Sequence, residues 1–367
     1  MPLMGLSPNI QARCSLSGKC ASTRSPTAGV NGIASKSLDA MLPILFAPLL
    51  SALTSESSPS GPSIEEMMAR FAAGAREVRS QGVDPTVYFA RLQYLERREA
   101  NVPAAAPAQL TADLQTQQSL EFLLDERLLS GRFLPPPKPG GAAVRLYASP
   151  GKAPDPIGVY VPAAPVGKYA LAILLHGMQQ TETDVVSRAV FRNLADASHV
   201  ILVAPYNGGS AQWNDAQTSD LLALIDKMRG LYPIDGRRVY LVGMSMGGAS
   251  AFHIAARHAD RFAAFMTVVG SLDPADAASA RRALRDRPVY LVSAGKDPIV
   301  TPADESMTYA ELARGCVAVA QYIAPTAGHD LYATSEQLER AWKDMLSGVV
   351  RSQNTRECDT IPGNASP

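Results

Sequence analysis

The stretch Val239-Tyr-Leu-Val-Gly-Met-Ser-Met-Gly-Gly248 decides the fold. It passes from an apolar segment typical of a buried strand, through Gly243-x-Ser245-x-Gly247, into a segment of helix length. The nucleophile-elbow motif requires this strand–turn–helix context, because a serine on so tight a turn needs near side-chain-free residues two positions before and after it. The turn also aims the N–H of Met246 towards the serine oxygen, where it can bind an oxyanion. We therefore predict Ser245 as a nucleophile and Met246 as an oxyanion-hole donor.

A serine hydroxyl needs a base, and the chain has only five histidines. His329 follows the last expected strand and is the predicted general base. Asp297 lies on the loop after the expected strand at 289–292 and is the predicted acid that orients it. The resulting order Ser…Asp…His is that of α/β-hydrolases and differs from the orders of chymotrypsin and subtilisin. Asp273, which follows the preceding strand, remains the rival acid.

Short apolar runs alternate with helix-length segments after residue 143. Runs that are apolar throughout are typical of strands covered by helices on both faces, as in a parallel sheet. This alternation predicts an α/β-hydrolase fold with a doubly wound, mostly parallel eight-stranded sheet. The expected strands are 144–148, 158–161, 171–175, 200–203, 239–242, 265–269, 289–292 and 319–323.

Residues 63–134 read as a helical N-terminal segment. Helices are expected from residue 64, from Asp84 as an N-cap before Pro85, and over about 110–129. A proline- and glycine-rich hinge at 135–142 separates this segment from a catalytic domain at 143–367. Because the hinge is short, we expect the helices to dock beside the first two strands of the catalytic domain.

Residues 1–62 read as a leader. An apolar run at 41–53 has the length of a signal-peptide core, and a serine-rich segment follows it. An over-long signal peptide, a start codon upstream of the true one, an organelle transit peptide and a disordered tail all remain open. We expect an exported, secreted or periplasmic protein, in which Cys316 and Cys358 would be the only cysteines and able to form a disulfide.

Composition limits the classes of ligand that we expect the protein to bind. The 34 basic residues equal the 34 acidic residues, so no net field favours nucleic acid or an anionic membrane. No apolar stretch is long enough to span a bilayer. Neither metal-ligand spacing nor a glycine-rich phosphate cradle is present, so we expect no metal and no cofactor.

The loop after the third strand should supply the second oxyanion donor. It reads Leu174-Leu-His-Gly-Met178, so the N–H of Met178 is predicted as that donor and His176 as a structural residue. Only residues 270–288 separate the sixth and seventh strands, which leaves no room for a cap domain and predicts an open site. The expected apolar substrate wall consists of Trp213, Ile299, Met178 and Met246.

From about Val144 onwards the chain resembles the secreted serine esterases grouped with polyhydroxybutyrate depolymerases and feruloyl esterases. It is similar also to the catalytic domain of prolyl-oligopeptidase-type peptidases. The matching segments are Tyr160-Val-Pro162, Leu174-Leu-His-Gly177, Trp213, Tyr232-Pro-Ile-Asp-Gly-Arg-Arg-Val239, the Ser245 turn, Gly295-Lys-Asp297 and Gly328-His329.

The resemblance implies hydrolysis of a carboxylic ester without a cofactor, on a small molecule or a polymer. An aryl ester and a polyester end are examples. A serine peptidase is the alternative enzyme, although the chain has no repeated propeller blades. A non-catalytic interaction protein on the same fold is the alternative from another class.

Overall fold

The computed structural model describes residues 62–104, 106–131, 137–148, 154–164, 167–209 and 213–350. The leader predicted at 1–62 lies outside these residues except for its last position, and Cys358 also lies outside them. Cys316 is disulfide-bonded.

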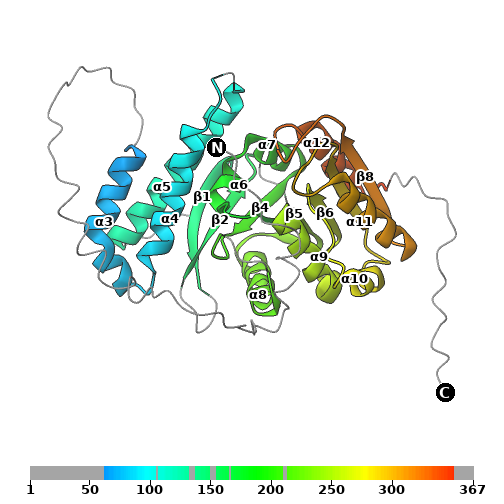
Figure 1. The fold of residues 1–367 in the computed structure, drawn as a ribbon. Helices are drawn as coiled ribbons and strands as arrows, with labels where there is room; N and C mark the ends of the chain where they lie inside the picture. Colours follow the sequence, from blue (N-terminus) through cyan, green and yellow to red (C-terminus); the bar gives the residue numbers. More distant parts are fainter. Residues whose placement is uncertain are drawn as a thin grey trace, which may run out of the picture. The chain divides into compact units, whose positions relative to one another are not determined.

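The described strands form one eight-stranded sheet in the order β1-β2-β4-β3-β5-β6-β7-β8 (Figure 1). β2 pairs antiparallel with both β1 and β4, and every other pair is parallel. The predicted mostly parallel, eight-stranded sheet is confirmed. The strands are β1 (Gly141–Tyr147), β2 (Asp155–Val161), β3 (Tyr169–Leu175), β4 (Val200–Pro205), β5 (Ile234–Met244), β6 (Ala264–Val268), β7 (Val289–Ala294) and β8 (Val319–Ala324).

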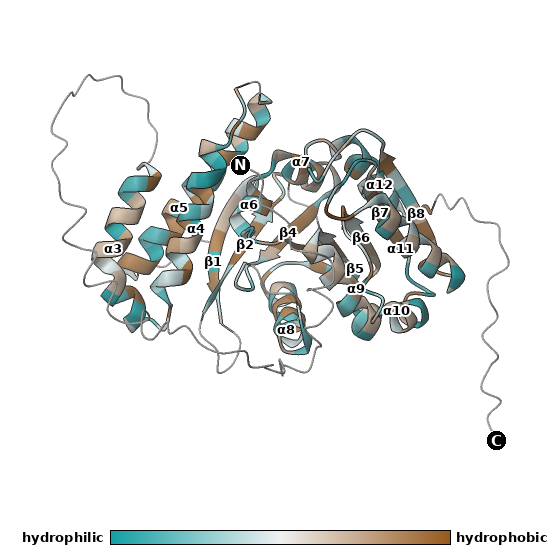
Figure 2. Ribbon diagram, viewed as in Figure 1, coloured by the Kyte–Doolittle hydropathy of each residue, from teal (hydrophilic) through white to brown (hydrophobic). Residues whose placement is uncertain are grey.

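Helices cover both faces of this sheet, and the core divides accordingly. Along β3, Ala170, Ala172 and Leu174 belong to one buried cluster, whereas Leu171 and Ile173 belong to the other. This alternation follows from the period of two along a strand. Figure 2 shows the apolar colouring gathered on the central strands. The helices beyond the N-terminal segment are α6 (Glu182–Ser187), α7 (Ala189–Ser198), α8 (Asp215–Leu231), α9 (Met246–His258), η1 (Ala259–Arg261), α10 (Ala277–Ala283), α11 (Pro302–Arg314) and α12 (Ser335–Ser347).

Three helices, α3 (Ile64–Ser80), α4 (Pro85–Ala100) and α5 (Ala108–Ser130), form a layer that we call the helical layer. Ser63 and Glu66 make a capping box at the start of α3, and Asp84 caps α4 before Pro85. The Phe71 and Tyr88 rings stack with centroids 4.3 Å apart between α3 and α4. α5 packs against β1, as the short hinge led us to expect, and also against α6.

Two connections bear on the predicted hinge and on the predicted absence of a cap domain. β1 begins at Gly141, inside the stretch predicted as a hinge. The connection from β6 to β7 holds only the short helix α10, so no cap domain is inserted there. In the described ranges, no helix combines the length and apolarity needed to cross a membrane.

Candidate active site

Ser245 is the single residue between β5 and α9. Its backbone has φ 51° and ψ −117°, a combination that a residue with a side chain rarely adopts. A Cβ on Gly243 would lie 2.1 Å from the Gly247 carbonyl oxygen, and a Cβ on Gly247 would lie 2.2 Å from the Leu175 carbonyl oxygen. Both glycines are therefore required for the close passage of strand and helix that exposes the Ser245 side chain.

The structure joins the three predicted catalytic side chains through two successive hydrogen bonds. Ser245 Oγ lies 2.9 Å from His329 Nε2, and His329 Nδ1 lies 2.7 Å from Asp297 Oδ2. The Asp297 carboxylate is buried, and its other oxygen accepts the N–H groups of Ile299 and Val300 at 2.8 and 3.0 Å. The carboxylate is thus fixed from both sides, so it can orient the imidazole.

Backbone contacts join the loops that carry Asp297 and His329. The N–H of Lys296 donates to the Ala327 carbonyl at 2.8 Å. A Cβ on Gly295 would lie 2.4 Å from the Pro325 carbonyl oxygen, so only glycine permits this approach. The spacing between acid and base is therefore set by the backbone.

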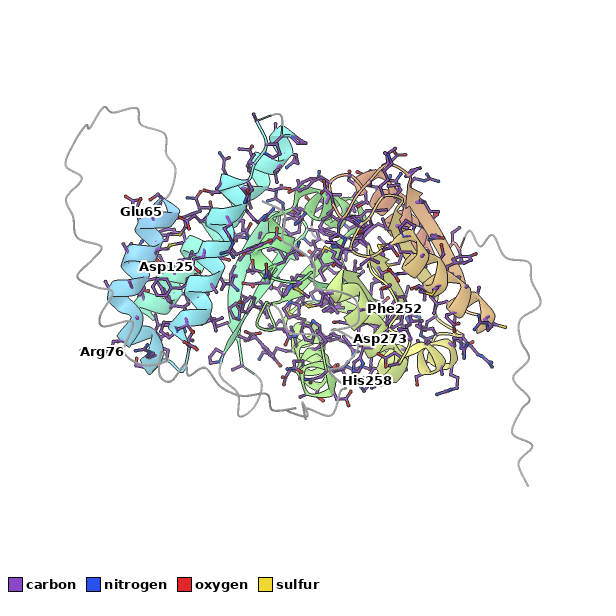
Figure 3. All side chains as sticks on the ribbon, in the orientation of Figure 1. Glu65, Arg76, Asp125, Phe252, His258 and Asp273 are labelled. Carbon is purple, nitrogen blue, oxygen red and sulfur yellow. The ribbon has the colours of Figure 1, made fainter. Side chains whose placement is uncertain are left out.

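The rival acid, Asp273, lies on the connection between β6 and α10 (Figure 3). Its carboxylate accepts the N–H of Ala275 at 2.8 Å, which is a local turn contact. Among the described residues, the hydrogen-bond partner of His329 Nδ1 is Asp297 and not Asp273. The geometry therefore favours Asp297.

The loop after β3 lies against Ser245. A Cβ on Gly177 would lie 3.4 Å from the Ser245 Cβ. The N–H groups of Gly177, Gln179 and Gln180 are all engaged, by the Gln180 side chain, Gly209 and Gly177 respectively. Within this described loop, the N–H of Met178 therefore remains available for a ligand. The N–H of Met246, as the first residue of α9, has no acceptor within its helix.

His176 bridges two loops beside the nucleophile. Its ring is buried, with Nε2 2.6 Å from the Tyr206 carbonyl oxygen and Nδ1 2.7 Å from the Gly177 carbonyl oxygen. These contacts fit the structural role expected for this histidine.

The expected substrate wall divides into exposed and buried members. Met178 is 55% exposed and Ile299 is 67% exposed, whereas Trp213 is only 5% exposed. Trp213 packs in the core cluster on the α8 and α9 face. Its backbone N–H donates to Ser250 Oγ at 3.3 Å. It also lines a cavity of about 70 Å³ with Asp155 and others. Trp213 is therefore buried among core side chains, and it does not form part of an exposed apolar wall with Met178 and Ile299.

Glu305 on α11 was not anticipated from the sequence. It is buried close to Ser293 and Asp297. Burial raises the pKa of Glu305 to about 8, and the negative charge of Asp297 adds to this. A carboxyl group that is largely protonated at neutral pH thus lies beside the buried acid of the site. In the described residues, no cluster of three or more histidine, cysteine or acidic side chains is arranged to hold a metal ion.

Comparisons with known proteins agree with this geometry. A family model described as putative esterase matches residues 153–353, which excludes the helical layer. The chain is 32% identical over 148 residues to the bifunctional acetylxylan esterase/xylanase XynS20E of Neocallimastix patriciarum, covering 39% of this chain and 22% of that protein. It is 32% identical over 142 residues to the putative esterase NocK of Nocardia uniformis subsp. tsuyamanensis, covering 35% of this chain and 38% of that protein. These alignments span less than two fifths of each relative's length.

Among solved structures, the chain is similar to the fluorophosphonate-binding serine hydrolase F, FphF, of Staphylococcus aureus. The TM-score is 0.50 at 15% identity, covering 57% of this chain and 99% of that chain. At this identity the similarity shows the fold alone, and it is the predicted α/β-hydrolase fold.

Proposed function

From the premise that the chain belongs to the putative esterase family and is a carboxylic-ester hydrolase, we propose that it acts through a Ser245–His329–Asp297 triad and an acyl-enzyme. The observation that carries this proposal is the alignment of the three side chains. Their successive separations of 2.9 and 2.7 Å are within hydrogen-bond reach, as proton transfer from a nucleophile to its base requires.

The reaction would begin with attack of Ser245 Oγ on the ester carbonyl carbon while His329 Nε2 accepts the hydroxyl proton. Asp297 would hold the proton on Nδ1 and stabilise the imidazolium. His329 then returns its proton to the departing alcohol, which leaves an acyl group on Ser245. A water molecule, deprotonated by the same nitrogen, attacks the acyl-enzyme, and His329 returns that proton to Ser245 Oγ as the carboxylic acid is released.

The negative oxygen of each tetrahedral intermediate would be bound by the N–H groups of Met178 and Met246. Their position on either side of Ser245, one on the β3 loop and one at the start of α9, supports this role. Loss of a single oxyanion donor typically lowers kcat by about 100- to 1,000-fold.

We propose a small or exposed ester as the substrate, such as an aryl ester or an accessible ester of a polymer. Two observations support this choice. The β6–β7 connection carries no cap, and the exposed Met178 and Ile299 side chains offer apolar surface beside the nucleophile.

The test is labelling with a fluorophosphonate probe, followed by turnover of a panel of acetyl, aryl and longer aliphatic esters and a peptide amide. We expect stoichiometric labelling of Ser245 and fastest turnover of soluble short-chain or aryl esters, with Ser245→Ala unlabelled. Labelling at another residue, or preference for the amide, would contradict the proposal.

A further inference from the structure

A buried ionic cluster joins the helical layer to the segment that follows β3. Arg91 on α4 is 2% exposed and donates to Glu182 at 2.5 and 2.7 Å. It also donates to Glu121 of α5 at 2.8 Å. Both glutamates are fully buried. Buried charged groups are costly unless they are paired, and here one guanidinium serves two carboxyl groups, so this cluster fixes the distance between α4, α5 and Glu182.

A second set of contacts extends the same junction. Asp184, fully buried on α6, bonds Arg98 of α4 and Arg188, and accepts the Tyr94 hydroxyl at 3.1 Å. The opposing charges of the two arginines outweigh the cost of burial and lower the pKa of Asp184. Hence this carboxylate stays ionised and bonded to the helical layer.

Arg91 reaches the Met178 loop by two routes. Glu182 stands two positions after Gln180, whose side chain closes the loop onto Gly177 at 2.7 Å. The Arg91 guanidinium also lies 4.4 Å from the centre of the Tyr206 ring, and the Tyr206 carbonyl contacts His176. Both routes end on residues that flank Met178.

The helical layer also reaches the loop of the catalytic histidine. Asp113 on α5 accepts the Tyr332 hydroxyl at 3.0 Å, and Tyr332 is three positions after His329. The same carboxylate accepts the N–H of Ala189 at 2.9 Å, which ties α5 to the start of α7. The Arg188 guanidinium lies 5.2 Å from the centre of the Tyr332 ring and so contacts the same side chain.

The distribution of these contacts is informative. Six polar side chains of α4 and α5 bond to residues 181–192 or to Tyr332 of the sheet domain: Arg91, Tyr94, Arg98, Asp113, Gln117 and Glu121. Residues 181–192 begin directly after the Met178 loop, and Tyr332 lies on the loop of His329, so these polar contacts end next to one loop of the candidate site and on another. We propose that the helical layer positions these loops: Arg91 is a positioning residue for the Met178 N–H, and Asp113 is one for His329.

This proposal rests on the proposed function, because it assigns the Met178 N–H to the oxyanion. Its expected signature is a larger loss of transition-state stabilisation than of substrate binding, because an oxyanion hydrogen bond depends on the exact position of the Met178 N–H, whereas apolar contact with the Met178 and Ile299 side chains does not. A displacement of about 1 Å at a reacting group can cost on the order of 100-fold in rate.

The decisive variant is Arg91→Met/Glu121→Gln/Glu182→Gln, which removes all three charges together and so avoids leaving a buried charge unpaired. With a p-nitrophenyl acetate substrate we expect kcat to fall about 10- to 100-fold while KM stays within about twofold. Affinity for a trifluoromethyl ketone, which forms a tetrahedral adduct with the nucleophile, should fall by the same factor as kcat. The single variant Arg91→Lys, which keeps the positive charge and both glutamates, should retain more of the wild-type kcat than the triple variant does.

Tyr332→Phe supplies the independent test of the histidine loop, because it deletes one hydroxyl and keeps the ring beneath Arg188. We expect a fall in kcat of a few fold, with a matching fall in the rate of fluorophosphonate labelling. The matched control is Arg70→Gln, which breaks a bond to Glu126 within the helical layer and touches neither loop. This control should lose stability without losing kcat.

A folded triple variant with wild-type kcat and inhibitor affinity would overturn the proposal, as would an equal loss of kcat in Arg70→Gln. A large rise in KM, or a new preference for acyl-chain length, would instead make the helical layer part of the substrate site and would also overturn it. Failure of the proposed function is separate: wild-type protein would then show neither Ser245 labelling nor ester turnover.

Discussion

The Ser245 turn and the Arg91 cluster are two regions of the molecule whose geometry is held by opposite means. At the turn, Gly243 and Gly247 allow backbone atoms to approach, and no charge is involved. At the cluster, one guanidinium is shared by Glu121 and Glu182, on elements far apart in the sequence. The turn therefore depends on the absence of side chains at Gly243 and Gly247. The cluster depends on the pairing of Arg91 with two buried carboxyl groups. Substitutions should separate the two dependences.

The largest effect is expected at the reacting groups. Ser245→Ala or His329→Ala should lower kcat by at least about 10,000-fold, and Asp297→Asn somewhat less, while circular dichroism and Tm stay near wild type. The double variant Ser245→Ala/His329→Ala should be little worse than Ser245→Ala, because the residues act as a unit. A folded Ser245→Ala protein with substantial turnover would refute the triad.

The next effect should come from volume at the turn. In Gly247→Ala the new Cβ would meet the Leu175 carbonyl at 2.2 Å, so β3 and α9 must separate. We expect a loss of about 1–3 kcal/mol in the free energy of unfolding, and a large loss of kcat. The matched control is Gly230→Ala in α8, which meets nothing within 4 Å and should be neutral or slightly stabilising. Denaturant unfolding and ester turnover measure both, and equal effects of the two changes would disprove the steric argument.

At the Arg91 cluster, an unpaired charge should lower the free energy of unfolding more than a change of side-chain volume does. Arg91→Met alone leaves Glu121 and Glu182 buried without their partner, and we expect it to cost about 3–5 kcal/mol of unfolding free energy. The triple neutral variant should be more stable than this single variant, although it carries more changes. Urea unfolding at neutral pH decides between them. If the triple variant were the less stable, the cluster would contribute through packing and not through charge.

The smallest effect is a pH dependence at Asp125, on α5 of the helical layer (Figure 3). Neither carboxylate oxygen has a hydrogen-bond partner among the described residues, and Arg70 is 4.0 Å away. Burial raises the pKa of Asp125 to about 7, from 3.8 for the free side chain. The folded state thus holds a proton that the unfolded state releases, so this residue lowers stability progressively as pH rises from about 4 to 7.

Asp125→Asn should therefore raise the free energy of unfolding at pH 8 by roughly 1–2 kcal/mol, less than the full pKa difference because the helices can relax on ionisation. At pH 4 the change should be close to zero. Thermal unfolding of both proteins across this range measures the difference, and a gain that is equal at both pH values would contradict the assigned protonation.

The sequence predicts features of this site that depend on local chain geometry. Gly243 and Gly247 around Ser245 predict the turn, and the loops after the next strands place Asp297 and His329 where the sheet order brings them together. The Met178 loop is found for the same reason. The positions of these residues can be predicted because each needs only a strand and the few residues that follow it.

Features that depend on contacts between distant elements could not be predicted. Arg91, Glu182 and Asp113 read as ordinary exposed charges of amphipathic helices, because their partners are known only after the helices dock. Glu305 reads as part of a helical first turn, and its burial beside Asp297 is a tertiary property. The burial of Trp213 could not be predicted either, because an aromatic residue in a loop has no periodicity that shows which way its side chain faces.

The contact between Asp113 and Tyr332 has a consequence for how the protein is made. The two residues are 219 positions apart, so Asp113 leaves the ribosome long before its partner exists. At typical synthesis rates the delay is roughly 10 to 40 s. Arg91, Arg98 and Asp113 gain partners at residues 182–189 early in this interval, so α4 and α5 can be joined to that segment before the histidine loop exists. Completion of the histidine loop is then the event that locks the first-made part of the chain onto the last.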